Sequence, residues 1–163
     1  MDDFNKFKSV VRQYAKAYSD FEEIQGKMKF LPEKGDQKTG VIGEAYIYQY
    51  LNKQGKGPEF GKTSEKAWDI KDKNGITYQV KTVSGYSEFK RISPIHKGWD
   101  YLYLVYLTKE LRPDKVLLVE SPKVWDQDVT KNLTFPSTST IKIGGQICDI
   151  KDVTDDFKKM LKL

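Results

Sequence analysis

The first part of the chain has the apolar periodicity of α-helices. Between residues 2 and 25, aromatic and apolar side chains recur at spacings of three and four: Phe4, Phe7, Val10, Val11, Tyr14, Tyr18 and Phe21. This spacing predicts an amphipathic helix capped by Asp2 or Asp3. Residues 37–54 predict a second helix, which Gly55 ends. One face of that helix is apolar apart from Glu44, a carboxylate that needs a buried partner or a function.

The middle of the chain has the two-residue alternation of β-strands. Residues 67–71 and 76–83 predict two strands joined by a hairpin turn, for which Asn74-Gly75 is the strongest local signal. Residues 101–108 are almost all apolar, as is typical of a central strand that is buried on both faces. Residues 115–120 predict the next strand.

The last part of the chain predicts a hairpin and a closing helix. Residues 121–125 are interpreted as a short helical turn and residues 127–140 as a polar loop. A hairpin over 140–150 turns at Gly144-Gly145, and a helix over 154–163 is capped by Thr154 or Asp155. This order of elements predicts an α/β (α+β) fold with a central mixed sheet flanked by helices. We expect one domain over residues 1–163.

Composition narrows the choice of partners only slightly. The net charge is +5 and the pI is about 9.0, which suits a polyanion partner without establishing one. Nearly all of the positive charge is lysine, and the only arginines are Arg12, Arg91 and Arg112. Lysine suits diffuse attraction to phosphates, whereas arginine suits bidentate reading of guanine, so these three arginines are of interest.

Compartment signals favour the cytoplasm. No apolar run approaches the roughly 18 residues of a membrane helix, and the first residues lack the pattern of a signal peptide. Cys148 is the only cysteine, so no internal disulfide can form, and we expect it to be a small core residue. We therefore expect a cytoplasmic protein without a membrane partner.

Candidate chemistry lies on the polar face of the hairpin over residues 67–83. Alternation places Gln79 and Lys81 on one face of their strand, and a tight hairpin sets Asp69 beside them. If the helix over 37–54 packs on that face, Glu44 joins them. Carboxylate and amide oxygens, with the backbone carbonyl of Val80, suit Mg²⁺, and a nearby lysine stabilises charge on a phosphate. The alternative is an exposed sheet face with ordinary polar residues, which explains Gln79 and Lys81 but not Glu44.

The spacing of these residues resembles the motif of the PD-(D/E)XK nuclease superfamily. Asp69, nine intervening residues and Gln79-Val80-Lys81 match that motif, and Glu44 matches its helix glutamate. The resemblance covers about residues 37–120, with the predicted helix 2–25 before it and the predicted hairpin and helix 140–163 after it. There are two departures: Gln79 stands where Asp or Glu is usual, and no proline precedes Asp69.

The resemblance implies a restriction-endonuclease-like core and a Mg²⁺-dependent DNA endonuclease, with Mn²⁺ as a substitute metal. It assigns catalysis to Glu44, Asp69, Gln79 and Lys81, and metal binding to Glu44, Asp69, Gln79 and Val80. A type II restriction-type enzyme that cuts double-stranded DNA as a homodimer is the main expectation. The alternatives are a Holliday-junction resolvase or repair nuclease of the same fold, or a non-catalytic nucleic-acid-binding module.

Candidate DNA contacts follow the second strand of the hairpin. Residues 84–97 carry Lys90, Arg91, His96 and Lys97 interleaved with aromatic residues, a mixture that suits contacts to phosphates. The alternative is a solvated loop, and the sequence does not separate the two. The polar residues of 125–140 can read bases or form turns, and turns are the preferred interpretation.

Overall fold

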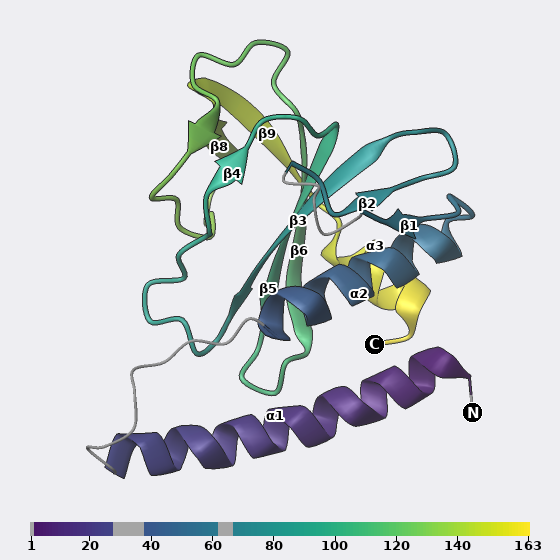
Figure 1. The fold of residues 1–163 in the computed structure, drawn as a ribbon, viewed down its shortest axis with the longest axis vertical. Coiled ribbons are helices and arrows are strands. Elements are labelled where there is room, and N and C mark those ends of the chain that lie inside the picture. Colours follow the sequence, from purple (N-terminus) through teal and green to yellow (C-terminus); the bar gives the residue numbers. More distant parts are fainter. Residues whose placement is uncertain (1, 28–37, 62–66) are drawn as a thin grey trace.

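The structure is a computed structural model that describes residues 2–27, 38–61 and 67–163 (Figure 1). Its three helices are α1 (Asp3–Lys27), α2 (Lys38–Lys53) and α3 (Thr154–Leu161). The strands are β1 (Glu59–Phe60), β2 (Ile70–Lys71), β3 (Thr77–Ser84), β4 (Ile95–His96), β5 (Tyr101–Leu107), β6 (Pro113–Glu120), β7 (Val129–Thr130), β8 (Thr140–Ile143) and β9 (Gln146–Asp152).

Seven of these strands form one mixed sheet in the order β1-β2-β3-β5-β6-β9-β8. The two long central strands β3 and β5 are parallel, and every other pair in the sheet is antiparallel. The predicted central mixed sheet with helices is thereby confirmed. Among the residues that the structure describes, no helix is long and apolar enough to cross a membrane.

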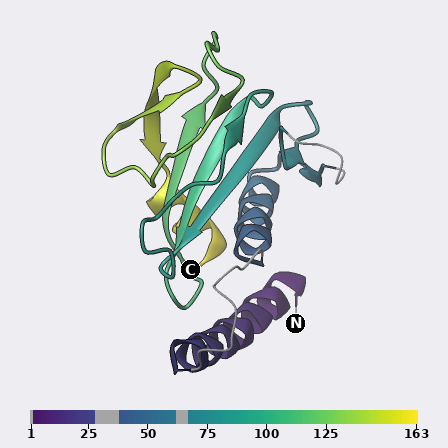
Figure 2. The ribbon, with the colours of Figure 1, turned by 60° about the vertical axis from the view of Figure 1, so that its left-hand side comes forward.

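The two faces of the sheet are covered differently. Figure 2 shows α2 lying against one face, with α1 below it. On that face, α2 and α3 enclose a cluster that includes Ile47, Leu51, Tyr78, Tyr103 and Phe157. The opposite face carries a second cluster, built from β3, β5, β6, the β8–β9 hairpin and the segments around β4 and β7. Both faces of β3 and β5 are therefore buried.

Several local predictions are confirmed at the level of single hydrogen bonds. The Asp2 carboxylate accepts the N–H of Asn5 at 2.7 Å and so caps α1. The 72–75 turn forms with Gly75 at a φ of +82°, and the Asp72 carboxylate accepts the N–H groups of Asn74 and Ile76. The β8–β9 hairpin turns at Gly144 and Gly145, which both have positive φ.

Three local predictions are wrong. The strand expected over 67–71 is only two residues long, because its pairing with β3 ends at Ile70. No helical turn forms over 121–125. Neither Thr154 nor Asp155 caps α3, whose N-cap is Val153 without a side-chain hydrogen bond.

The segments interpreted as loops over 84–97 and 125–140 pair with each other. Ile95 and His96 of β4 lie opposite Thr130 and Val129 of β7 in an antiparallel ribbon. Further along, the N–H of Ile92 donates to the carbonyl of Leu133, and the N–H of Phe135 donates to that of Lys90. This ribbon packs on the sheet face opposite α2.

Helix α2 approaches β3 most closely at Gly43. A β-carbon added there would lie 1.9 Å from the Thr82 hydroxyl oxygen, whereas one added at Gly40 meets nothing within 4 Å. Only a residue without a side chain fits at position 43. The contact sets the height of α2 on the sheet and therefore the position of Glu44, the next residue.

We expect Gly43→Ala to destabilise the fold by about 1–3 kcal/mol, because a methyl group there overlaps Thr82. Gly40→Ala, on the same helix, is the matched control and should stabilise the fold by up to about 1 kcal/mol. Urea denaturation measures both. Adding Thr82→Ala to Gly43→Ala should recover part of the loss. Equal effects of the two glycine substitutions would contradict the close contact.

Candidate functional site

The site begins at the point where the β2–β3 ladder ends. The last pair of that ladder is Ile70 with Tyr78, which places Asp69 opposite Gln79. Asp69 bends onto the edge of β3, where its carboxylate accepts the N–H of Val80 at 2.7 Å. Since a residue in a strand directs its N–H and C=O to the same edge, the Val80 carbonyl also points to this side. An aspartate and a free-edge carbonyl thus lie together.

Glu44 lies on α2, on the face of the sheet opposite to the side chains of Gln79 and Lys81. The expectation that α2 packs on the face of Gln79 and Lys81 is wrong: α2 packs on the face of Tyr78 and Val80. Nevertheless Glu44 and Lys81 lie close enough that each shifts the pKa of the other, and Asp69 shifts both. Asp69 lies at the unpaired edge of β3, and its charge acts on both Glu44 and Lys81.

Burial makes charge unfavourable at all three side chains. It raises the pKa of Glu44 to about 7, with a further increase from the charge of Asp69 and a decrease from Lys81. The pKa of Asp69 is also raised by burial, although the Val80 N–H and Lys81 oppose this. Burial lowers the pKa of Lys81 against the attraction of Asp69 and Glu44. Coupled, desolvated groups of this kind are typical of functional sites.

Gln79 supplies an acceptor without a protein partner. Its side chain is 2% exposed, and its amide nitrogen donates to the Ala67 carbonyl at 2.8 Å. A carbonyl only accepts, so this bond fixes the orientation of the amide. The other atom, Oε1, is buried and has no hydrogen-bond partner among the described residues. A buried acceptor in this state can be satisfied by a cation or a water molecule.

These residues fit a hard divalent cation. Glu44, Asp69, Gln79 and Val80 offer oxygen atoms, which Mg²⁺ prefers, and Mg²⁺ typically binds only one or two protein carboxylates. Within residues 2–27, 38–61 and 67–163, no group of three or more His, Cys, Asp or Glu side chains could hold a metal. A cation at this site would have at most two carboxylates and would need the Gln79 amide and the Val80 carbonyl as further ligands.

Glu44→Gln should stabilise the metal-free protein at high pH. The native pKa of about 7 lies above the ordinary 4.5, so the folded state favours protonated Glu44. Protonated Glu44 stabilises the folded state fully below pH 4.5, and this stabilisation is lost as the pH rises through 7. Because Glu44 is only half-buried, solvent screening reduces the expected gain to about 1–2 kcal/mol.

Denaturation in EDTA at pH 5 and pH 8.5 measures this difference. At pH 8.5 Glu44→Gln should be clearly more stable than the native protein. At pH 5 the difference in stability should be much smaller. Exposed Glu88 provides the control, since Glu88→Gln should change stability little at either pH. A pH-independent effect of Glu44→Gln would show that the carboxylate is solvated.

The four predicted DNA contacts lie on the segment that leads into and forms β4. Lys90 places its ammonium 4.9 Å from the ring centre of Tyr106, and Arg91 stacks on Phe89 at 5.6 Å. His96 is exposed on β4, and Lys97 forms a 2.6 Å ion pair with Asp128. That pair partly neutralises Lys97. No described contact joins any of the four to Glu44, Asp69 or Lys81.

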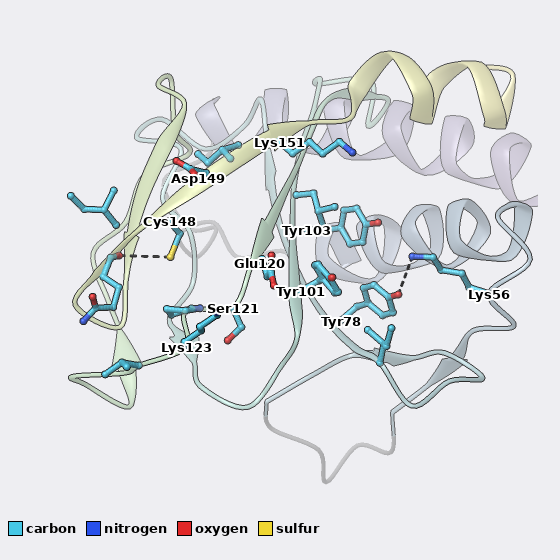
Figure 3. Close-up of a pocket in the computed structure, with 17 residues that line it drawn as sticks. Lys56, Tyr78, Tyr101, Tyr103, Glu120, Ser121, Lys123, Cys148, Asp149 and Lys151 are labelled. Carbon is cyan, nitrogen blue, oxygen red and sulfur yellow. Dashed lines mark hydrogen bonds between the residues drawn. The ribbon is translucent and has the colours of Figure 1, made fainter.

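A separate cavity of about 840 Å³ lies on the α2 side of the sheet (Figure 3). Tyr78, Tyr101 and Tyr103 line it as a stack with ring centres about 6 Å apart, and Lys56 donates to the Tyr78 hydroxyl at 3.1 Å. None of the four predicted catalytic residues lines this cavity. The candidate site is instead a strand edge that α2 and the β2–β3 hairpin border.

Two positions that matter to the site were not singled out from the sequence. Gly43 and Thr82 form a close contact between α2 and β3, and the buried Thr82 hydroxyl has no hydrogen-bond partner among the described residues. The glycine directly before Glu44 was the available signal, because a glycine inside a helix often marks a close approach.

Neither known protein families nor curated protein sequences match this chain. Its function is therefore argued from the geometry of the site and from the resemblance of its motif.

Proposed function

We propose that this protein is a Mg²⁺-dependent endonuclease that hydrolyses phosphodiester bonds of double-stranded DNA. The observation that carries the proposal is the position of Asp69 at the unpaired edge of β3, next to Gln79, whose buried Oε1 has no hydrogen-bond partner among the described residues. The charges of Asp69, Glu44 and Lys81 act on one another, and burial disfavours each of them. Their spacing in the sequence is that of the PD-(D/E)XK motif.

The residues have distinct roles in this proposal. Asp69 and Glu44 hold the cation, with the Val80 carbonyl and Gln79 Oε1 as neutral ligands. Bound Mg²⁺ supplies the neutralisation of negative charge that phosphodiester hydrolysis requires. Lys81 donates hydrogen bonds to the phosphate oxygens as negative charge develops on them. Its lowered pKa also makes it easier for Lys81 to give up a proton or orient the attacking water.

A DNA cleavage assay tests the proposal. The protein is incubated with supercoiled plasmids of different sequence and with phage DNA, in Mg²⁺, in Mn²⁺ and in EDTA. We expect cleavage with either metal and none in EDTA. The absence of cleavage of linear, branched and modified DNA with both metals would refute an endonuclease.

The products separate the classes of nuclease. Discrete bands from plasmid DNA favour a restriction-type enzyme, whereas cleavage confined to four-way junctions favours a resolvase, which the same site geometry permits. DNA binding without cleavage would favour the non-catalytic module.

Cleavage of both strands at a symmetric site would require two copies of the chain, because two-fold DNA symmetry is matched by a two-fold dimer. The aromatic face of α1 offers little surface for such an interface, because much of it packs inside the protein. Val11 and Ala15 are buried, and Phe4, Phe7 and Tyr14 pack against the same cluster. The homodimer is thus a proposal that rests on the expected substrate, and sedimentation of the protein with and without DNA tests it.

A further inference from the structure

A second cavity, of about 590 Å³, lies beside α1. Its walls come from α1, the turn between β5 and β6, and the end of α3. Five of its lining residues are cationic: Lys8, Arg12, Arg112, Lys158 and Lys162. Two acidic residues, Glu110 and Asp114, also line it, so the cavity has an excess of positive charge.

The cations of this cavity differ in their ion pairing. Lys158 lies 3.8 Å from Asp114 and is partly satisfied. By contrast, Arg12 and Arg112 form no ion pair within the part of the chain that the structure describes. These are two of only three arginines in the sequence, and segments a hundred residues apart bring them to one cavity.

Tyr46 of α2 lines the same cavity as the two arginines. It is 3% exposed, and its ring packs edge-on against Phe7 of α1 with centres 5.3 Å apart. Burial raises the pKa of Tyr46, and the positive charges of Arg12 and Arg112 oppose this increase. Both arginines thus line the cavity with Tyr46 and act on its hydroxyl electrostatically. The hydroxyl stays protonated at neutral pH and can donate a hydrogen bond.

We propose that this cavity is a phosphate-binding site, in which Arg12 and Arg112 bind the phosphate oxygens and Tyr46 donates a hydrogen bond to them. Planar guanidinium groups match the oxygen atoms of phosphate in a bidentate manner, which the ammonium groups of Lys8 and Lys162 do not. The lysines add attraction without directional contacts. The phosphate comes either from the DNA backbone or from a small phosphorylated compound, and the same groups recognise both.

This proposal does not depend on the nuclease activity. The cavity shares no lining residue with the cluster of Glu44, Asp69, Gln79 and Lys81. If DNA is the source, the cavity holds the duplex at a second point, beside α1. If a small compound is the source, binding joins α1 to the rest of the protein through α3 and the β5–β6 turn.

The test measures binding by the whole protein in EDTA, where cleavage cannot contribute. Calorimetry with inorganic pyrophosphate and fluorescence anisotropy with a labelled DNA duplex are applied to Arg12→Gln and Arg112→Gln. Lys142→Gln, an exposed charge removal on β8 outside the cavity, is the matched control. Thermal unfolding without ligand confirms that each variant is folded.

We expect each arginine variant to bind about tenfold more weakly than the control, as loss of a charged hydrogen bond implies. Weaker duplex binding, with a salt dependence reduced by about one phosphate contact per arginine, assigns the cavity to the DNA backbone. Weaker pyrophosphate binding with unchanged duplex binding assigns it to a small phosphorylated compound. If neither ligand binds more weakly to the arginine variants than to Lys142→Gln, the proposal is overturned. Because binding is measured in EDTA, neither outcome decides the result of the DNA cleavage assay.

Discussion

Replacing Lys81 with alanine is expected to reduce Mg²⁺-dependent DNA cleavage by about 10³-fold or more, the scale of losing a donor aimed at developing charge. Burial lowers the pKa of Lys81, and the charges of Asp69 and Glu44 oppose this decrease. A cation kept in a place that disfavours its charge has little structural value. Its position is explained if it acts on a phosphate held at the same edge. Initial rates of plasmid cleavage at saturating Mg²⁺ measure the effect.

Two further variants separate catalysis from folding. Lys81→Met keeps most of the aliphatic stem and removes the buried charge, so it should abolish cleavage without reducing the free energy of unfolding. Lys73→Ala, an exposed lysine in the turn that precedes β3, should cleave at the native rate. Native-like cleavage by Lys81→Met would show that the lysine is structural, and loss of cleavage in Lys73→Ala would point to general weakening of DNA binding.

The hairpin that carries the site was predictable because its signals are local. Asn74-Gly75 fits a turn that needs positive φ, and alternation along 76–83 gives the strand directly. The face on which α2 packs was not predictable. Gln79 and Val83 are as buried as Tyr78 and Val80, at 2%, 3%, 1% and 6% exposure. When both faces of a strand are buried, alternation cannot tell which of them receives a helix.

The ribbon of β4 and β7 shows a second limit of sequence patterns. Each strand is two residues long, and Ile95 pairs with Thr130 across a wide gap in the sequence. Such pairing depends on the apolar surface of the sheet beneath it, to which Ile92 and Ile95 are anchored at 5% and 0% exposure. A local reading of these polar segments gives loops, because their order comes from tertiary contacts.

Thr154 illustrates why the cap of α3 was misplaced. A threonine before an amphipathic stretch is a common N-cap. Here its hydroxyl instead bonds to Asp152 at 2.6 Å and to the backbone of Val116 on β6. The residue therefore ties the helix to the sheet. Tertiary packing decides whether the Thr154 hydroxyl caps the helix or bonds to Val116. The local sequence pattern carries no information about that packing.

Replacing Gln79 with glutamate is expected to produce the largest change in stability. Gln79 is 2% exposed and its amide nitrogen donates to the Ala67 carbonyl. A carboxylate there would face that carbonyl without a proton to donate, close to Asp69, whose carboxylate accepts the N–H of the adjacent Val80. An unpaired buried charge destabilises a protein by about 3–5 kcal/mol, so the metal-free variant should unfold at much lower urea at pH 8. Gln13→Glu, an exposed position on α1, is the control and should change little.

Mg²⁺ should reverse much of this loss if the site is a metal centre. A third carboxylate adds a charged ligand where Gln79 offers a neutral oxygen, so Mg²⁺ should stabilise Gln79→Glu more than the native protein. Urea denaturation across a series of Mg²⁺ concentrations, with EDTA as reference, measures the difference. The same extra stabilisation of native protein and variant would mean that Gln79 does not face the cation. Greater stabilisation of the variant by Mg²⁺ would place Gln79 among the ligands. It would also show that glutamine at this position lowers metal affinity while keeping the metal-free protein stable.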